Sequence, residues 1–203
     1  MSIEERAQQA KQAQIRCASL SVEAKNRALE AIAAALTERR AEIETANRAD
    51  ITRAEQENLE APLLKRLKFQ GEKIDQSCTG VRGVAGQDDP VGIIQSGRQL
   101  DEGLELYRVT CPIGVIGMIF ESRPDVLVQM AALSLKSGNA VLLKGGREAL
   151  ETNRVLARII AGATEEAGIP AGWIQLIETR EDVHSMLALD RQINVADLEQ
   201  LLT

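Results

Sequence analysis

An alternation of buried strands and amphipathic helices in the second half of the chain constrains its fold most. Apolar runs that suit buried strands occupy residues 113–120, 140–143 and 173–177. The segments between them, 124–136 and 147–167, have helical spacing of apolar residues and end near glycines. Strands joined by helices of this length require right-handed crossovers, so the sequence predicts a parallel sheet. A weaker strand is expected at 192–195, and a short helical end at 197–203.

The first half of the chain has a different pattern. Residues 1–85 are expected to be helical, with Ser21 capping a helix whose apolar residues fall on one face. Glycines and Pro90 then interrupt the helical pattern. The runs 91–97 and 104–110 flank the turn residues 101–103, which predicts a β-hairpin outside the main sheet.

Charge and cysteine content exclude several classes of function. A formal net charge of −6 argues against binding to nucleic acid or to an anionic membrane surface, because both need a basic protein surface. No apolar run approaches the ~20 residues of a membrane-spanning helix, and residues 1–6 do not resemble a signal peptide. The scattered cysteines and a single histidine provide neither a disulfide framework nor a zinc site. We therefore expect a cytoplasmic protein with reduced thiols.

Polar turns follow the first two strands of the predicted sheet. The first turn is Glu121-Ser122-Arg123, and the second is Lys144-Gly145-Gly146-Arg147. Because the carboxyl ends of parallel strands meet at one edge of a sheet, both turns are candidates for binding an anionic ligand. The alternative is structural. Ser122 would then cap the next helix, Arg123 would be a surface charge, and the second turn would be an ordinary basic helix start with an exposed Arg147.

Four segments together resemble the γ-glutamyl phosphate reductases, a branch of the aldehyde dehydrogenase superfamily. They are PIGVIG at 112–117, FESRP at 120–124, LKSGNAVLLKGG at 135–146 and AGIPAG at 167–172. The likeness extends back through 88–92 and the helical start, and forward to about residue 190. It covers only the front part of the family's chain.

The resemblance implies an α/β fold with three parts. These are a helical region at 1–85, a β-hairpin at 86–110, and a partial Rossmann-like, nucleotide-binding domain of the aldehyde dehydrogenase type at 111–203. In the superfamily such a hairpin helps join subunits, so a homo-oligomer is expected. Pairing with glutamate 5-kinase is a further expected partnership.

The resemblance also implies an activity, the NADPH-dependent reduction of γ-glutamyl phosphate to glutamate 5-semialdehyde in proline biosynthesis. Lys144 would contact the adenosine ribose, while Gly145 and Gly146 let the backbone approach the cofactor. Arg147 stands where NAD-using members often have a glutamate, and a guanidinium there favours the 2′-phosphate of NADP(H). On the substrate side, Ser122 stands closest to the superfamily's oxyanion-stabilising asparagine, and Arg123 would bind the substrate's phosphate or α-carboxylate.

The family's nucleophilic cysteine is expected beyond residue 203. None of Cys17, Cys78 and Cys111 has a nearby histidine or helix N-terminus to lower its pKa, so no catalytic residue is assigned within this chain. The chain is therefore expected to be a truncated form that is inactive alone. Two other interpretations remain open: a non-catalytic interaction module that pairs through its hairpin, and another acyl-phosphate or acyl-CoA reductase of the superfamily.

Overall fold

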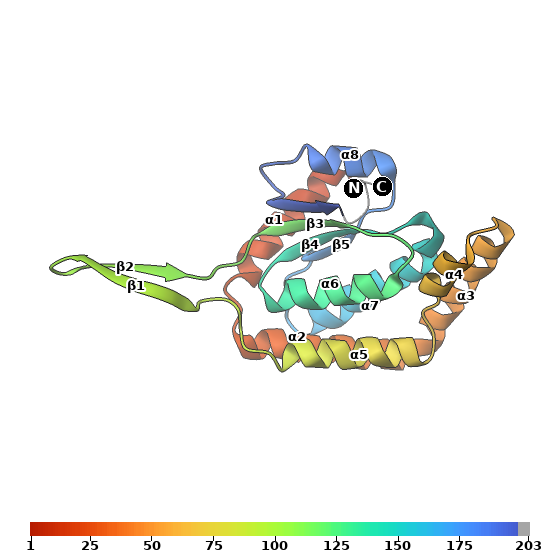
Figure 1. Cartoon of the computed structure of the whole chain (residues 1–203), viewed down its shortest axis with the longest axis horizontal. Coiled ribbons are helices and arrows are strands. Elements are labelled where there is room, and N and C mark those ends of the chain that lie inside the picture. Colours follow the sequence, from red (N-terminus) through yellow and green to blue (C-terminus); the bar gives the residue numbers. More distant parts are fainter. Residues whose placement is uncertain (199–203) are drawn as a thin grey trace.

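The structure, a computed structural model, describes residues 1–198, apart from the side chains at 180, 197 and 198 (Figure 1). Its helices are α1 (Ile3–Cys17), α2 (Val22–Glu38), α3 (Arg40–Gln56), α4 (Ala61–Leu67), α5 (Glu72–Ala85), α6 (Pro124–Lys136), the 3₁₀ helix η1 (Arg147–Ala149), α7 (Leu150–Glu166) and α8 (Arg180–Leu187). Its strands are β1 (Ile94–Asp101), β2 (Leu104–Val109), β3 (Val115–Ile119), β4 (Ala140–Lys144), β5 (Ile174–Leu176) and β6 (Val195–Leu198).

Local signals fix many of these boundaries. Ser21 caps α2 as expected, because its side chain accepts a hydrogen bond from the backbone N–H of Ala24. Pro124 occupies the first turn of α6, where the missing N–H of proline has no cost. Gly138 and Gly168 follow α6 and α7 with φ angles of 71° and 92°, a conformation that glycine adopts without strain.

The main sheet is parallel, as expected, with its four described strands in the order β5-β4-β3-β6. In order of appearance along the chain this is 3-2-1-4, the order of the first strands of a doubly wound nucleotide-binding sheet. Successive strands are added on one side of β3 as far as β5, and β6 is then added on the other side, so the strand order reverses between β3 and β6. Ligands of such sheets bind at the carboxyl ends of the two strands that flank this point.

The end of the chain differs from the expectation. The fourth strand runs from Val195 to Leu198 and not over 192–195. The helix expected at 197–203 is wrong for Asp197 and Leu198, because both residues pair with β3 in this strand. The remainder of that expectation, 199–203, lies outside the described residues.

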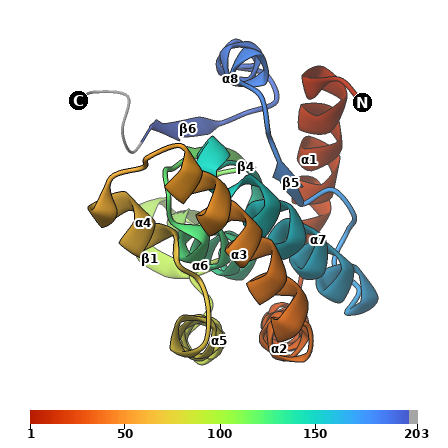
Figure 2. The same ribbon diagram turned by 90° about the vertical axis from the view of Figure 1, so that its right-hand side faces the viewer.

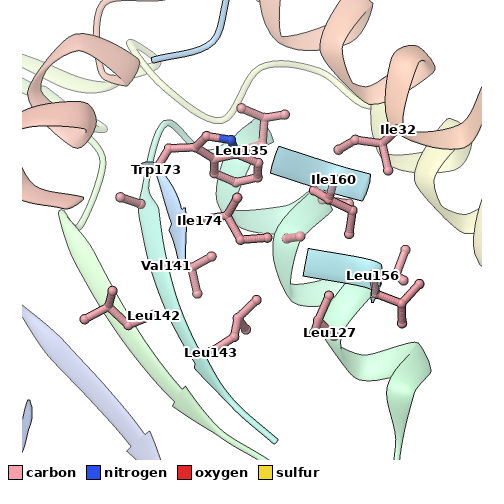
Figure 3. Close-up of a cluster of buried hydrophobic side chains, with 14 of the residues drawn as sticks. Ile32, Leu127, Leu135, Val141, Leu142, Leu143, Leu156, Ile160, Trp173 and Ile174 are labelled. Carbon is pink, nitrogen blue, oxygen red and sulfur yellow. The ribbon is translucent and has the colours of Figure 1, made fainter. Parts of the chain in front are cut away.

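Helices cover both faces of the sheet. Helices α6 and α7 pack on one face with α2 and α5 behind them, while α1 and α8 lie on the other face (Figures 1 and 2). Between the sheet and the first pair, Val141 and Leu143 of β4 meet Leu127 of α6 and Leu156 of α7 (Figure 3). All four side chains are completely buried, and this continuous apolar core holds the polar strand ends in place.

The hairpin of β1 and β2 extends away from this body (Figure 1). Its strands pair antiparallel outside the main sheet, as expected, and every residue in them is exposed. The turn contains Gly103 with a φ of 76°. The division of the chain into three parts, at residues 85/86 and 110/111, stays a prediction. Helix α1, which belongs to the expected helical part, packs directly on the sheet.

Candidate functional site

The carboxyl ends of β3 and β4 bring the two polar turns to one edge of the sheet. Ile119 pairs with Lys144 in the parallel register, and the Phe120 N–H donates to the Lys144 carbonyl at 3.0 Å. The turn after β3 and the turn after β4 therefore begin side by side.

Glu148 joins these turns. Its Oε1 accepts hydrogen bonds from both the backbone N–H and the hydroxyl of Ser122, each at 2.7 Å. A Cβ on Gly146 would lie 1.9 Å from the same oxygen, so only glycine leaves room for this contact. Both donors of Ser122 are used, so Ser122 can stabilise a substrate oxyanion only when Glu148 releases one of them.

The structural alternative for Ser122 is wrong. The residue has a φ of 40° and lies before the N-cap position of α6, which is Arg123. No side chain caps this helix. The serine therefore positions the turn through Glu148 and does not cap the helix.

The turn after β4 presents two cations. Lys144 is partly buried, and its Nζ donates to the carbonyl of Gly145. Arg147 begins η1, its side chain is 85% exposed, and it forms an ion pair with Glu57 at 2.9 Å. A Cβ on Gly145 would lie 2.1 Å from Nδ2 of the buried Asn153. Both glycines of the turn thus make room for protein side chains, and their role at a cofactor stays a prediction.

Helix α3 holds the turn from outside. The fully buried carboxylate of Asp50 accepts hydrogen bonds from the backbone N–H groups of Glu151 and Thr152, at 3.3 and 2.8 Å, and from the Thr152 hydroxyl at 2.7 Å. Arg53 forms an ion pair with Asp50 and donates to the Arg147 carbonyl at 3.2 Å.

The carboxylate of Asp50 fills the N-terminus of α7. Helix N-termini in nucleotide-binding folds often hold phosphate, but the first turn of α7 already holds the carboxylate of Asp50. The carboxylate of Asp50 therefore occupies the place that a phosphate would take at this helix N-terminus. Sequence reasoning missed Asp50, Arg53 and Glu148. The available signal was weak: Asn47 and Asp50 are polar residues on the buried face of α3.

Arg123 faces a different part of the edge. It forms an ion pair with Asp125 at 2.9 Å and lines a cavity of about 560 Å³ between α4, α5 and α6. The sheet edge thus has Lys144 and Arg147 on the β4 side and Arg123 on the side of α6.

The three cysteines lie away from these turns. Cys17 and Cys78 are buried, and burial raises the pKa of the Cys17 thiol to about 11. Cys111 is exposed and precedes β3, so it lies toward the amino end of the strand that Ser122 follows. Within residues 1–198, no group of His, Cys, Asp and Glu side chains is arranged to hold a metal ion. No helix in the same part of the chain is long and apolar enough to span a membrane.

The model of the aldehyde dehydrogenase family matches residues 1–198 of this chain. The gamma-glutamyl phosphate reductase of Acetivibrio thermocellus is 57% identical over 195 residues, which are 96% of this chain and 45% of that protein. The crystal structure of the Thermotoga maritima gamma-glutamyl phosphate reductase matches with a TM-score of 0.93 and 35% identity, over 97% of this chain and 48% of that one. The corresponding Saccharomyces cerevisiae structure matches with a TM-score of 0.90 and 40% identity, over 97% and 50%.

The chain therefore spans about half the length of these relatives. A probable aldehyde dehydrogenase from Listeria monocytogenes matches at 18% identity with a TM-score of 0.73, which shows a shared fold alone.

Proposed function

The chain belongs to the aldehyde dehydrogenase family, and we propose that it forms the amino-terminal part of an NADPH-dependent γ-glutamyl phosphate reductase. The observation that supports this most is the 57% identity, over 96% of the chain, to a relative with that name. The reaction would convert γ-glutamyl phosphate to glutamate 5-semialdehyde, a step of proline biosynthesis. The two turns at the carboxyl ends of β3 and β4 are the parts of the chain that we assign to it.

The turn after β4 suits a phosphorylated ribose. Lys144 would donate hydrogen bonds to the ribose hydroxyls, and Arg147 would pair with the 2′-phosphate through its planar guanidinium. The carboxylate of Glu57 competes for the same guanidinium, which limits how much Arg147 contributes. Gly145 and Gly146, which carry no side chains, would let the backbone of this turn approach the cofactor on the sides that Asn153 and Glu148 leave open. NADPH, when bound, would supply the hydride.

The turn after β3 suits the substrate. Arg123 would orient an anionic group of γ-glutamyl phosphate. The N–H and hydroxyl of Ser122 would stabilise negative charge on the acyl oxygen once Glu148 releases them, because hydrogen-bond donors aimed at that oxygen favour the charge that develops on it. Glu148 is then a positioning residue that holds these donors between turnovers.

We assign the nucleophile to a part of the enzyme outside these residues. Attack on the acyl carbon requires a thiolate, whereas Cys17 and Cys78 are buried and Cys111 lies before the first strand of the sheet. The chain by itself should show no NADPH-dependent reduction of γ-glutamyl phosphate. Turnover that survives purification and disappears in Cys111→Ser would contradict this assignment.

A chimera tests the activity directly. The chain is joined to the part of the Acetivibrio thermocellus relative that follows its matched segment, and NADPH oxidation is followed with γ-glutamyl phosphate. We expect activity comparable to that relative, and none in a control chimera whose grafted cysteines are replaced by serine. A folded chimera that reduces another acyl phosphate or an acyl-CoA, but not γ-glutamyl phosphate, would favour the other superfamily reductases.

Partners follow from the same proposal. An acyl phosphate hydrolyses in water, so direct transfer from a glutamate 5-kinase in the cytoplasm would protect it.

The exposed apolar side chains of the hairpin favour pairing with a second copy. They also fit the second candidate function, a non-catalytic module that pairs through the hairpin. Mixed oligomers with a full-length reductase, formed without any gain in activity, would support that candidate.

A further inference from the structure

The cavity between α4, α5 and α6 is basic in a protein that is acidic overall. Its lining includes Lys65 and Arg66 at the end of α4, Lys73 in the first turn of α5, and Arg123 before α6. Asp125 is the acidic residue of this lining. Four cations thus face one carboxylate, although the whole chain has a net charge of −6.

Three of the four cations of this cavity have no carboxylate partner in the part of the chain that the structure describes, whereas Arg123 is paired with Asp125. Among the described residues, no carboxylate forms an ion pair with Lys65, Arg66 or Lys73; the Nζ of Lys73 donates to the Lys65 carbonyl at 3.1 Å. Burial lowers the pKa of Lys73, and the charges of Arg123, Lys65 and, to the smallest extent, Lys68 lower it further, against the opposing effect of Asp125. Cations that lie close together in a partly enclosed space repel one another, and an anion that binds there lowers their free energy.

We propose that this cavity binds the α-amino-acid end of the substrate, with the α-carboxylate toward Lys65, Arg66 and Lys73 and the α-ammonium toward Asp125. The assignment rests on the proposed function, because it takes the substrate to be a γ-glutamyl compound. An amino-acid end carries one anion and one cation. The cavity offers Lys65, Arg66 and Lys73 to the anion, and to the cation it offers Asp125, which the ammonium would share with Arg123. A phosphate group would need only the cations.

The position of the cavity supports the assignment. Arg123, which lines it, directly follows Ser122, the candidate donor to the acyl oxygen. A γ-glutamyl chain places its α-carbon three carbons from the acyl carbon. One substrate molecule can therefore reach from the sheet edge into the cavity, and Arg123 marks the boundary between its two ends.

Binding to the chain itself can be measured by nuclear magnetic resonance titration with matched probes. L-Glutamate γ-methyl ester carries both α-groups, monomethyl glutarate lacks the ammonium, and methyl 4-aminobutyrate lacks the α-carboxylate. We expect the first to bind most tightly, with shifts at α4, α5 and the start of α6. Inorganic phosphate is the fourth probe. Equal binding of methyl 4-aminobutyrate, or stronger binding of phosphate at the same residues, would overturn the proposal.

Variants locate the site. Lys73→Met should weaken binding of the glutamate ester about tenfold, the effect of losing one charge-assisted hydrogen bond. Lys68→Met is the matched control, because it removes the same charge from an exposed neighbour outside the cavity and should change affinity less than about twofold. Gln76→Glu adds a negative charge to the exposed lining without removing a buried group, and should also weaken binding. Unchanged affinity in both Lys73→Met and Gln76→Glu would refute the site.

The chimera separates failure of this proposal from failure of the proposed function. In an active chimera, Lys73→Met should raise KM for γ-glutamyl phosphate about tenfold and leave KM for NADPH unchanged. An active chimera whose substrate KM does not respond would refute the cavity alone. A folded but inactive chimera would refute the function, while the direct titration would still report on the cavity.

Discussion

Glu148 fixes the relative position of the two polar turns, because one of its oxygens accepts both hydrogen bonds from Ser122. The acceptor, Glu148, follows β4, and the donor, Ser122, follows β3. A cofactor that moves the β4 turn would therefore also change the donors available to the substrate. Arg147, one residue earlier, is the side chain of this turn most open to a ligand.

Cofactor preference is a prediction for Arg147. In the active chimera, Arg147→Glu should raise KM for NADPH up to about tenfold and leave KM for NADH similar or lower, because a carboxylate repels the 2′-phosphate. Glu57→Gln is the complementary variant. It removes the competing carboxylate, so it should lower KM for NADPH, and salt should screen both effects. If neither variant changes the ratio of the KM values for NADPH and NADH, Arg147 does not bind the 2′-phosphate.

Thiol reactivity is a prediction for the cysteines. In the folded chain at pH 8, a disulfide reagent should react quickly with one equivalent of thiol, which Cys111→Ser removes. At pH 10 the Cys17 thiol should remain protonated, because its pKa is about 11 in the fold against an ordinary value of 9.0. Cys17 and Cys78 should react only after unfolding in urea. Fast labelling of two or three thiols would show that the helical layer opens readily.

At the scale of elements, α3 and α7 are joined by the contact of Asp50 with the first turn of α7. Helix α7 has no side-chain cap of its own, since Ala149 occupies its N-cap position. The orphan N–H groups of its first turn are therefore satisfied by a carboxylate from a distant helix.

Removing that carboxylate should be costly. Asp50→Ala leaves the buried N–H of Thr152 and the part-buried N–H of Glu151 without their partner, and should lower the free energy of unfolding by about 3 kcal/mol in urea titration. Asp75→Ala is the control, since Asp75 is an exposed carboxylate paired with Arg40, and its loss should be much smaller. Similar losses in the two variants would mean that water replaces the carboxylate of Asp50.

The elements that could be predicted from the sequence are those with local boundary signals. Helix α6 was expected at 124–136 and runs from Pro124 to Lys136, because a proline and a glycine delimit it. Strand β6 was misplaced because its pairing with β3 is non-local: Ile116 lies opposite Val195, and no nearby residue marks that register.

The same distinction applies to the site. Ser122 and Lys144 could be placed at one edge because each directly follows a strand. The contact between Asp50 and Thr152 could not, because these residues are 102 positions apart in the chain. Only the polar character of Asn47 and Asp50, on the face of α3 that also carries Ile43, hinted that this helix buries hydrogen-bonding groups.

At the scale of the whole molecule, the hairpin is the part that the rest of the fold does not stabilise. A two-stranded ribbon is at best marginally stable alone in water. Here both strands are exposed and carry large apolar side chains, among them Leu104, Leu106 and Tyr107. Packing against another protein surface would bury these apolar side chains and so stabilise the hairpin.

The last prediction concerns association. Light scattering over a concentration series should show oligomers of the chain, and the double variant Leu104→Lys/Leu106→Lys should shift them toward monomer, because lysines at these exposed sites resist burial. Ile15→Lys is the matched control: Ile15 is a 62% exposed apolar residue on α1, outside the hairpin, and its replacement should leave association unchanged. If the control disperses the oligomers and the hairpin variant does not, the contact lies on α1. Oligomers that persist in both variants would point instead to edge pairing along β6, the outermost described strand beside β3, since an unpaired strand edge is itself a surface for association.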